Sequence, residues 1–454
     1  MNRMNYKGQT VLVMGYGISG KSVVNYLLAK EANVILNDRG VVTADPSVSL
    51  LIKQGVKVIE GGHPMSALTG VDLIVKSPII PYTLDLLREA QERQIPILTD
   101  VELAYLECKA PIIGITGSNG KTTTTQLIQL LLGQSSEGTA YIAGNIGVPA
   151  LEVCQKALAE DRVVMELSSF QLMGIQKFRP KIAVFTNFYS AHLDYHGNRQ
   201  AYIAAKMNLA RNLTPQDYLV YNADQEEMVD LFKGVDAKKV PFSRLQPQSF
   251  GAYLQGDALY FAGEKVMDRA AIRLPGNHNL ENVLAAIAVA KIEGIDNNKI
   301  ETIVSGYQGM PHRIQWVGEW QGVTYYNDSK ATNTTASLTA LKSFKQEILY
   351  IGGGLDRGND FSDLIQGVNS VKAAFLYGQS AHKMAKDFKN TKIDKVQVFD
   401  HLEDATLAAI KSAKDGQVVL FSPACASWDQ FKNYEERGET FMQVVNQYYD
   451  QKGD

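Results

Sequence analysis

The sequence predicts an α/β protein with parallel sheets, and three observations lead to this fold class. Short apolar runs alternate with helical patterns along almost the whole chain of 454 residues. These runs fall into three series, each beginning with its own strand. A glycine-rich turn of the kind that binds phosphate joins a strand to a helix at the start of the second series. We therefore expect three domains, at residues 1–108, 109–309 and 310–454.

Composition narrows the class of protein. Hydrophobic residues make up 45% and charged residues 20%, as in ordinary globular proteins. The formal net charge of -3 gives no basic field for nucleic acid, and no apolar run is long enough for membrane insertion. The first residues lack the apolar core of a signal peptide. The three cysteines form neither a disulfide framework nor a zinc pattern. We expect a cytoplasmic protein.

The first series contains the glycine motif GYGISG at residues 15–20, after a strand and opening a helix. Together with Asp38 at the end of the next strand, it is typical of a dinucleotide-binding turn. It also fits a tight turn without a ligand, or a site for another nucleotide diphosphate. The expected strands of this series are 10–15, 33–38, 56–61, 71–77 and 95–98, and its expected helices are 21–30 and 83–93.

The second series opens with a strand at 111–116 and the phosphate-binding turn at 117–122. Lys121 would reach the terminal phosphates and the hydroxyl of Thr122 would bind Mg²⁺. The usual spacing places a glycine where Ile115 stands, so this turn is a variant of the pattern. The alternative is a chance Gly-Lys-Thr turn. Further strands are expected at 139–144, 162–169, 181–188 and 217–224.

Polar residues lie at the carboxyl ends of these strands, where open α/β sheets bind ligands. Glu166 stands in an apolar strand, where a carboxylate is costly unless it is paired or bound to a metal. Asn187, His192, Asp194 and His196 follow the next strand. We predict a functional role for His192, while Asp194 and His196 stay undecided. The third series has expected strands at 322–328, 347–354, 373–378, 395–399 and 417–424.

Several segments, in this order, resemble the Mur ligases of bacterial cell-wall synthesis. They are GSNGKTTT at 117–124, ELSSFQ at 166–171, TNF at 186–188 followed by His192 and His196, Lys206, GNHNLEN at 276–282, MPHR at 310–313 and NDSKATN at 327–333. Within the family, YYNDSKATN and the segment at 422–441 are similar to the members that add D-glutamate. The likeness covers essentially the whole chain.

The resemblance implies an N-terminal Rossmann-like domain for a UDP-linked substrate, a central P-loop ATPase-type domain and a C-terminal Rossmann-like domain for the amino acid. It implies ATP-dependent joining of D-glutamate to UDP-N-acetylmuramoyl-L-alanine through an acyl phosphate, with release of ADP and phosphate. The partners would be these small molecules, with two Mg²⁺ ions as cofactors.

The resemblance also implies site residues. The expected catalytic residues are Lys121, His192 and Lys206. Those expected at ATP are Gly117, Ser118, Asn119, Gly120, Lys121, Thr122, Thr123, Asn279, Asn282, Arg313 and Asp328. Those expected at the metals are Thr122, Glu166, His192 and Lys206, the last as a carbamylated lysine, because an ammonium cannot bind Mg²⁺. Without the resemblance, Lys206 fits a solvated charge on an amphipathic helix.

The UDP-linked substrate is expected at Ile18, Ser19, Arg39, Ser77 and Asn145. D-glutamate is expected at Lys330, Thr332, Arg357, Ser427 and Tyr434. Arg357 takes the place nearest to a family lysine, and a guanidinium can grip a carboxylate with two hydrogen bonds. The alternative for Arg357 is an exposed loop charge, and the alternative for Arg313 and Asp328 is a structural ion pair.

Three other functions stay open from the sequence. The chain could be a different Mur ligase or a folate polyglutamate ligase, which share this chemistry. It could be a nucleotide-binding protein with a degenerate site, although Lys121, Thr122, Glu166 and His192 are intact. It could be a dehydrogenase, which has no use for a second phosphate-binding turn.

Overall fold

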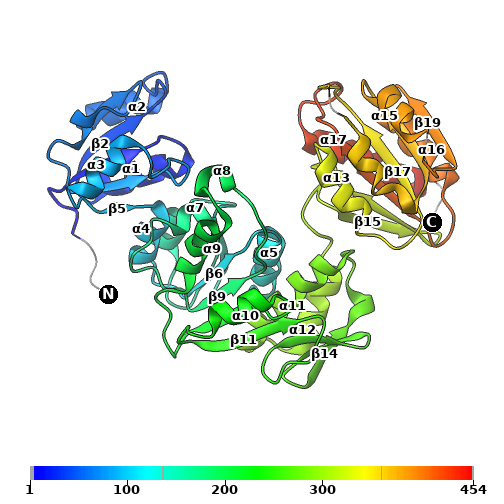
Figure 1. Cartoon of the computed structure of the whole chain (residues 1–454), viewed down its shortest axis with the longest axis horizontal. Helices are drawn as coiled ribbons and strands as arrows, with labels where there is room; N and C mark the ends of the chain where they lie inside the picture. The colour runs from blue at the N-terminus through cyan, green and yellow to red at the C-terminus, as the bar shows by residue number, and fades with distance from the viewer. Residues whose placement is uncertain (1–4, 135–137, 359, 390, 452–454) are drawn as a thin grey trace. The chain divides into compact units, whose positions relative to one another are not determined.

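A computed structural model describes residues 5–134, 138–358, 360–389 and 391–451. It contains three sheets, one in each series of strands that the sequence predicts, so the α/β class is confirmed (Figure 1). The chain forms two compact units. One runs to Arg269 and includes Glu281–Ile303, and the other comprises Ala270–Leu280 and the chain from Val304 onward. The domain boundaries near residues 109 and 310 stay predictions.

The N-terminal sheet is parallel and has the strand order β3-β2-β1-β4-β5. Its order reverses between β1 and β4, so their carboxyl ends border a crevice of the kind that holds ligands. Its elements are β1 (Thr10–Met14), α1 (Ile18–Ala29), β2 (Asn33–Asp38), α2 (Pro46–Lys53), β3 (Lys57–Glu60), η1 (Met65–Leu68), β4 (Leu73–Lys76), α3 (Asp85–Glu92) and β5 (Ile97–Leu98).

The second sheet has nine strands in the order β14-β13-β12-β11-β10-β9-β6-β8-β7. Its strands are β6 (Ile112–Thr116), β7 (Ala140–Gly144), β8 (Arg162–Glu166), β9 (Ile182–Phe185), β10 (Tyr218–Asn222), β11 (Lys238–Ser243), β12 (Ala252–Gln255), β13 (Ala258–Phe261) and β14 (Glu264–Asp268). The strand β6 lies between β8 and β9, so the turn after β6 is flanked by the ends of both. The sequence predicted none of the strands β11 to β14, which extend the sheet beyond β10; β11 pairs in parallel with β10 and β12, and β13 forms antiparallel pairs with β12 and β14.

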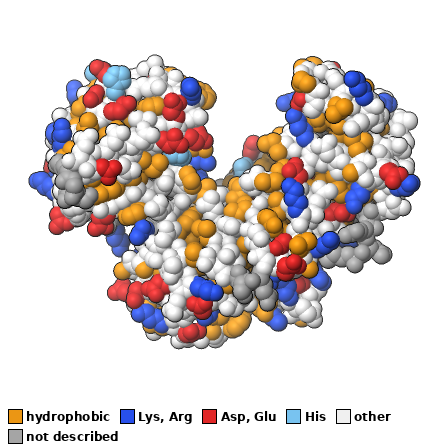
Figure 2. Space-filling model, turned by 180° about the vertical axis from the view of Figure 1, so that it is seen from behind, with side chains coloured by type: hydrophobic (Ala, Val, Ile, Leu, Met, Phe, Trp, Pro, Cys, Tyr) orange, Lys and Arg blue, Asp and Glu red, His pale blue; other side chains and the backbone are white. Residues whose placement is uncertain are grey.

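The helices of the central region are α4 (Asp100–Glu107), α5 (Lys121–Leu132), α6 (Ala150–Lys156), α7 (Ser169–Leu172), α8 (Leu193–His196), α9 (Arg199–Met207), α10 (Glu226–Phe232), α11 (Asn277–Ile292) and α12 (Asn297–Gly306), with the short turns η2 (Asn208–Ala210) and η3 (Arg269–Ala271). Among the described helices, none has the length and apolar character needed to cross a membrane. On the face shown in Figure 2, acidic and basic side chains are interspersed.

The C-terminal sheet has the order β15-β16-β20-β17-β18-β19, in which the β15–β16 pair is antiparallel and the others are parallel. Its elements are β15 (Gln315–Trp320), β16 (Val323–Asn327), α13 (Thr334–Leu341), β17 (Ile348–Gly353), α14 (Ser362–Ile365), η4 (Val368–Ser370), β18 (Val371–Tyr377), α15 (Ala381–Phe388), β19 (Lys395–Phe399), α16 (Leu402–Ser412), β20 (Val418–Ala424) and α17 (Tyr434–Asp450). Apolar clusters cover both faces, which is why its strands are almost continuously apolar.

A buried carboxylate connects α4 to the central sheet. Glu102 is 1% exposed, and its oxygens accept hydrogen bonds from the backbone N–H groups of Gln176, Lys177 and Phe178 at 2.7–3.1 Å. The backbone of Thr99 adds a hydrogen bond to Gly174. The segment that follows the N-terminal sheet is therefore fixed to the turn before β9.

We predict that Glu102→Ala lowers the free energy of unfolding by about 2–4 kcal/mol, because three backbone N–H groups lose their buried acceptor. Urea unfolding followed by circular dichroism measures the loss. The exposed Glu92 on α3 supplies the control, since Glu92→Ala should stay within about 0.5 kcal/mol of the original protein. A similar stability for both variants would contradict the anchoring role of Glu102.

Candidate active site

The turn between β6 and α5 can be built only with glycine at two positions. Gly117 has φ 148° and Gly120 has φ 81°. A Cβ atom at Gly117 would lie 1.9 Å from Thr186 Oγ1, and one at Gly120 would lie 2.2 Å from Asn282 Oδ1. Ile115, which departs from the usual spacing, lies inside β6 and is fully buried. The missing glycine therefore falls in the strand and leaves the turn unaffected.

Residues after β9 hold this turn in place. Asn187 Oδ1 accepts a hydrogen bond from the backbone N–H of Asn119 at 2.9 Å, and Thr186 Oγ1 donates to the Asn119 carbonyl at 2.6 Å. The backbone N–H of Ser118 donates to the Asn187 carbonyl. The sequence assigned no role to either residue: both belong to the TNF segment of the resemblance, and Asn187 was also noted as a strand-end residue. Their position directly after an apolar strand was the available signal.

Lys121 is the first residue of α5 and lies over the turn. Its ammonium donates to the carbonyls of Gly117 and Ser118 at 2.9 and 3.0 Å. Thr122 and Thr123 are partly exposed in the first turn of the same helix, whose N-cap Gly120 makes no side-chain cap. Backbone N–H groups at the start of this helix, its dipole and the Lys121 ammonium lie at one end of α5, which is the arrangement that binds nucleotide phosphates in other proteins.

Glu166 ends β8 and is 1% exposed. Its Oε1 accepts a hydrogen bond from the Asn145 side-chain amide at 2.8 Å, while Oε2 has no hydrogen-bond partner among the described residues. A buried carboxylate oxygen without a partner is costly, and a cation is the group that would relieve the cost. Asn145, which the sequence assigned to the UDP-linked substrate, thus also orients Glu166.

Lys206 lies on α9 and is buried with 1% exposure, so the solvated alternative from the sequence is wrong. Its Nζ donates to the Gly117 carbonyl at 2.7 Å and lies 4.7 Å from the centre of the Tyr202 ring. Burial lowers the pKa of this amine to about 6, with Lys121 adding to the effect and Glu166 opposing it. Burial therefore favours the neutral form of this amine over the ammonium.

Aromatic rings surround the histidines before α9. His192 is exposed, adopts a left-handed backbone with φ 52° and lies edge-on to Phe170 at 4.9 Å between ring centres. His196 stacks on Phe170 and shares a hydrogen bond of 2.9 Å with Ser169 Oγ. Within the described ranges, no three His, Cys, Asp or Glu side chains group together as a metal site. The predicted set instead combines a hydroxyl, a carboxylate, an imidazole and a modified lysine.

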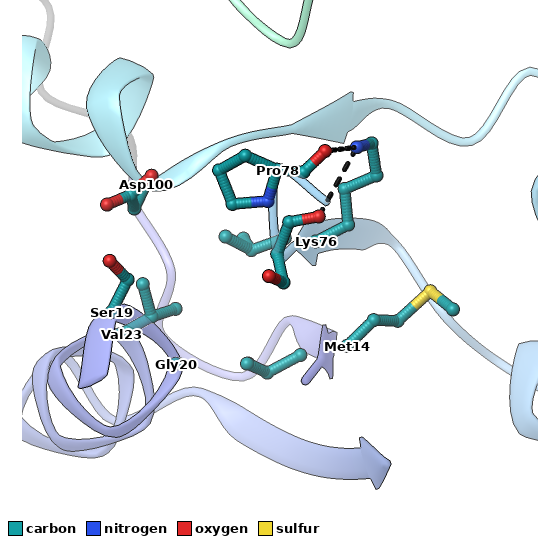
Figure 3. Close-up of a pocket in the computed structure, with 10 residues that line it drawn as sticks. Met14, Ser19, Gly20, Val23, Lys76, Pro78 and Asp100 are labelled. Carbon is teal, nitrogen blue, oxygen red and sulfur yellow. Dashed lines mark hydrogen bonds between the residues drawn. The ribbon is translucent and has the colours of Figure 1, made fainter. Parts of the chain in front are cut away.

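Four of the five predicted UDP residues follow strands of the N-terminal sheet: Ile18 and Ser19 begin α1, Arg39 follows β2 and Ser77 follows β4. The fifth, Asn145, follows β7 of the central sheet. Ser19 and Ser77 line a cavity of about 10 Å³, and the Ser19 hydroxyl points toward the Asp100 carboxylate (Figure 3). Asp100 was not singled out from the sequence. Its carboxyl group is buried, and burial raises the pKa of this group. Ile18 is 79% exposed at the start of α1, and Arg39 is exposed after β2.

Asp38, the acidic residue at the end of β2, holds the first glycine-rich turn in place. Asp38 Oδ2 accepts a hydrogen bond from the backbone N–H of Tyr16 at 2.7 Å, and Oδ1 accepts one from Gly40 at the same distance. Asp38 therefore fixes the first glycine-rich turn.

The two predicted ATP asparagines of α11 lie in different compact units. Asn282 is buried, and its Oδ1 accepts a hydrogen bond from Thr124 Oγ1 at 3.3 Å. It therefore packs directly on the phosphate-binding turn. Asn279 donates from its side chain to the carbonyl of Pro275 at 2.8 Å, which fixes the start of its helix.

Asp328, in the second compact unit, is 4% exposed at the end of β16. It accepts hydrogen bonds from Ser422 Oγ at 2.6 Å and from the Ile314 backbone at 3.1 Å. Burial raises the pKa of this carboxyl group to about 7, opposed by its hydrogen bonds and the nearby Arg313. Arg313 itself is exposed, and the ion pairs among the described residues do not include this pair. The structural ion pair expected as an alternative is not formed.

The predicted D-glutamate residues lie at the same edge of the C-terminal sheet. Lys330 and Thr332 are exposed after β16, and the Lys330 ammonium lies 5.2 Å from the centre of the Tyr434 ring. The Arg357 guanidinium lies 4.5 Å from the centre of the Trp428 ring, next to the buried Ser427. The backbone pairing of Leu355 with Ala426 brings these two loops together.

Arg437 connects three of these segments and was missed from the sequence. It is fully buried and donates to the Ser329 hydroxyl, the Ser329 carbonyl and the Cys425 carbonyl at 2.7–3.0 Å. Its Nη1 would lie 3.2 Å from a Cβ atom at Gly354. The available signal was its place on the apolar stripe of α17 with Phe441, Val445 and Tyr449.

Comparison with protein families matches all three parts of the chain. Residues 9–99 match the Mur ligase MurD-like N-terminal domain, residues 115–290 the Mur ligase middle domain, and residues 312–425 the Mur ligase glutamate ligase domain. The matched middle segment contains the phosphate-binding turn, Glu166, His192 and Lys206.

Similar proteins and structures agree with these matches. The UDP-N-acetylmuramoylalanine--D-glutamate ligase of Latilactobacillus sakei is 47% identical over 97% of this chain and 98% of the relative. The enzyme of the same name from Shouchella clausii is 46% identical over 97% of both chains. Among crystal structures, the UDP-N-acetylmuramate-alanine ligase of Thermotoga maritima covers 98% of this chain and 99% of its own, with a TM-score of 0.55 and 18% identity. The MurF ligase of the same organism, in complex with ADP, covers 98% and 97%, with a TM-score of 0.55 and 17% identity.

The two distant structures share the fold, and the near-full-length relatives share close to half of their residues with this chain. Membership also decides against the dehydrogenase that the first glycine motif had left open. The chain belongs to the Mur ligase family.

Proposed function

We propose that the chain joins D-glutamate to UDP-N-acetylmuramoyl-L-alanine with ATP, through an acyl phosphate, and releases ADP and phosphate. The observation that carries the proposal is the full-length similarity to relatives named for this ligation. The product is a precursor of peptidoglycan. Because ATP and nucleotide-linked sugars are cytoplasmic metabolites, the proposed location is the cytoplasm.

Activation of the substrate carboxylate is the first chemical task. A carboxylate is a poor acyl donor, and transfer of the γ-phosphoryl group of ATP converts it into an acyl phosphate with a good leaving group. Attack of one anion on another needs positive charge around the transferred group. Lys121 and the N–H groups at the start of α5 supply part of that charge. Asn279, Asn282, Arg313 and Asp328 are proposed as further ATP contacts.

The residues at the phosphate end fit a magnesium site. Thr122 offers a hydroxyl, Glu166 offers the carboxylate oxygen without a partner, and His192 offers an exposed imidazole. Oxygen ligands with phosphate and water are what Mg²⁺ prefers. Bound Mg²⁺ would supply electrostatic stabilisation of the phosphoryl oxygens. We assign Thr122 and Glu166 to a first ion, and His192 with Lys206 to a second.

Carbamylation of Lys206 is proposed as the way in which this lysine becomes a metal ligand. The neutral amine is the form that attacks CO₂, and burial lowers the pKa of Lys206 to about 6. The resulting carbamate would place anionic oxygen beside Lys121, whose positive charge opposes an ammonium at this point. The buried position thus favours the modified form over the charged amine.

The second chemical task is attack of the amine of D-glutamate on the acyl carbon. The two carboxylates of this amino acid need cations and hydroxyl donors. We propose that Arg357 pairs with the side-chain carboxylate with help from Ser427, and that Thr332 serves the α-carboxylate beside Lys330 and Tyr434. Ile18, Ser19, Arg39 and Ser77 are proposed to hold the UDP moiety, with Asn145 nearer to the muramoyl end.

A direct assay tests the proposed function. The protein is incubated with UDP-N-acetylmuramoyl-L-alanine, D-glutamate, ATP and Mg²⁺, and the ligated product, ADP and phosphate are measured. A panel of other amino acids and UDP-muramoyl peptides distinguishes the other Mur ligations. A preference for another pair of substrates would overturn the assignment, and absence of turnover with every pair would favour a degenerate nucleotide-binding protein.

We predict that Lys121→Ala lowers the rate of product formation by at least about 100-fold, because a cation is removed from the transferred phosphoryl group. The rate is measured as ADP release at saturating substrates. Lys53→Met, a substitution of an exposed lysine on α2, serves as the control and should keep the original rate. Near-original turnover by Lys121→Ala would refute the assignment of the ATP site.

We predict that Lys206→Ala is inactive and that acetate partly restores its turnover, because a small carboxylate can stand in for the carbamate oxygens. Nuclear magnetic resonance with isotopically labelled bicarbonate should show the carbamate in the original protein and lose it in the variant. A fully active Lys206→Ala protein without acetate would show that the modification is dispensable.

We predict that Arg357→Ala raises the KM for D-glutamate by at least about tenfold and leaves the KM for ATP unchanged, because a charge-assisted pair is lost. Initial rates are measured with varied D-glutamate and fixed ATP. The exposed Arg88 on α3 gives the control substitution Arg88→Ala. An unchanged KM for D-glutamate would place Arg357 outside the pocket.

A further inference from the structure

A buried lysine without a carboxylate among its hydrogen-bond partners lies under the loop that follows β4. Lys76 is 1% exposed, and its ammonium donates to the carbonyls of Ser77, Pro78 and Ile80 at 3.3, 3.2 and 2.8 Å. Figure 3 shows Lys76 beside Pro78, with its hydrogen bonds as dashed lines. The centre of the Tyr82 ring lies 4.4 Å away on another side. An ammonium has three donors, and here each is matched by a carbonyl of one short loop.

A tyrosine from the central region binds two of the same carbonyls. The Tyr195 hydroxyl, on α8, lies 3.1 Å from both the Pro78 and the Ile80 carbonyl oxygens and shares its proton between them. Two donors from different elements therefore fix the carbonyl side of the loop 77–80. On its other side the loop exposes Ile79, which is 73% exposed.

The same tyrosine touches the surroundings of the predicted metal ligand. Its ring lies edge-on to Phe170 at 4.6 Å between ring centres, and Phe170 lies edge-on to His192 at 4.9 Å. The helix α8 begins directly after His192. Contacts thus run from the loop with Ser77, through Tyr195 and Phe170, to His192.

We propose that Lys76 and Tyr195 are positioning residues that hold the loop 77–80 ready for the UDP moiety of the substrate and tie it to the helix after His192. The proposal rests on the proposed function, since it needs Ser77 to face the nucleotide end of the substrate. Burying an ammonium is costly unless its donors are matched, so Lys76 stabilises only loop conformations that turn these three carbonyls inward. Tyr195 adds a bond that exists only when the loop and α8 are together.

The test uses two variants of the full chain. Tyr195→Phe removes the hydroxyl and keeps the ring on Phe170, and Lys76→Met removes the charge and keeps the apolar length. Binding of UDP alone is measured by calorimetry, and KM values are measured for the UDP-linked substrate and for ATP. Tyr260→Phe, on the distant strand β13, controls for loss of a tyrosine hydroxyl.

For Tyr195→Phe we expect the Kd for UDP and the KM for the UDP-linked substrate to rise about tenfold, which corresponds to the loss of about one hydrogen bond to the loop, with the KM for ATP unchanged. Lys76→Met should give the larger effect. If Lys76→Met does not fold, Tyr195→Phe alone decides. A Tyr195→Phe protein with lower thermal stability but the original Kd for UDP would overturn the proposal and leave a purely structural role.

The wild-type protein separates this inference from the proposed function. Turnover by the wild type with an unchanged Kd for UDP in Tyr195→Phe overturns the positioning role and leaves the ligase assignment intact. A wild type that binds no UDP overturns the positioning role, and the ligase assignment fails as well only if this protein also gives no turnover. Equal rises in the KM for ATP and for the UDP-linked substrate would also count against the proposal, because the loop is expected to affect one substrate only.

Discussion

The hydrogen bonds that press the phosphate-binding turn against the end of β9 are the constraint on which the candidate site depends. Thr186 and Asn187 fill the space that a side chain at Gly117 would need. The backbone of the turn can therefore pack directly against the residues that follow β9. This approach also brings the Gly117 carbonyl to Lys206 and to Lys121. One glycine conformation therefore sets the positions of both lysine amines relative to the start of α5.

The electrostatics of the site follow from that packing. Two amines converge on the carbonyls of one turn, and burial lowers the pKa of Lys206, the more buried of the two. The nearby Glu166 keeps one carboxylate oxygen without a partner among the described residues. A buried carboxylate oxygen without a partner is costly, and this cost is the reason why a cation is proposed at Glu166.

In the C-terminal unit, three loops meet at one edge of the sheet, and they contain Ser329, Gly354 and Cys425. Arg437 holds them together from the interior, because its guanidinium donates to backbone and hydroxyl oxygens of two loops and lies against the third. The exposed Lys330 and Arg357 each lie over an aromatic ring at this edge. The exposed cations thus stand on loops that a buried cation holds together.

The sequence by itself determined the α/β class, most strands of the three sheets, the phosphate-binding turn and the family. These features are local: apolar runs mark strands, and a Gly-Lys-Thr turn between strand and helix carries its chemistry within a few residues. The exact spacing at Ile115 was less informative, since that residue belongs to the strand. The strands β11 to β14 were not predicted; no helix lies between them in the described range 238–268, so the alternation of strands and helices ends before this part of the sheet.

The tertiary structure decided what the side chains face. The pattern around Lys206 fits an exposed helix position, and only packing against the turn at Gly117 shows that the amine is buried. Arg437 and Glu102 likewise have partners far away in the chain, so their burial has no local signal beyond an apolar stripe. Lys76 and Tyr195 meet at carbonyls of one loop although 119 positions separate them in the sequence. Burial and long-range hydrogen bonds depend on the folded chain as a whole. Sequence patterns therefore identified the candidate site residues but not the buried residues that hold the surrounding loops in place.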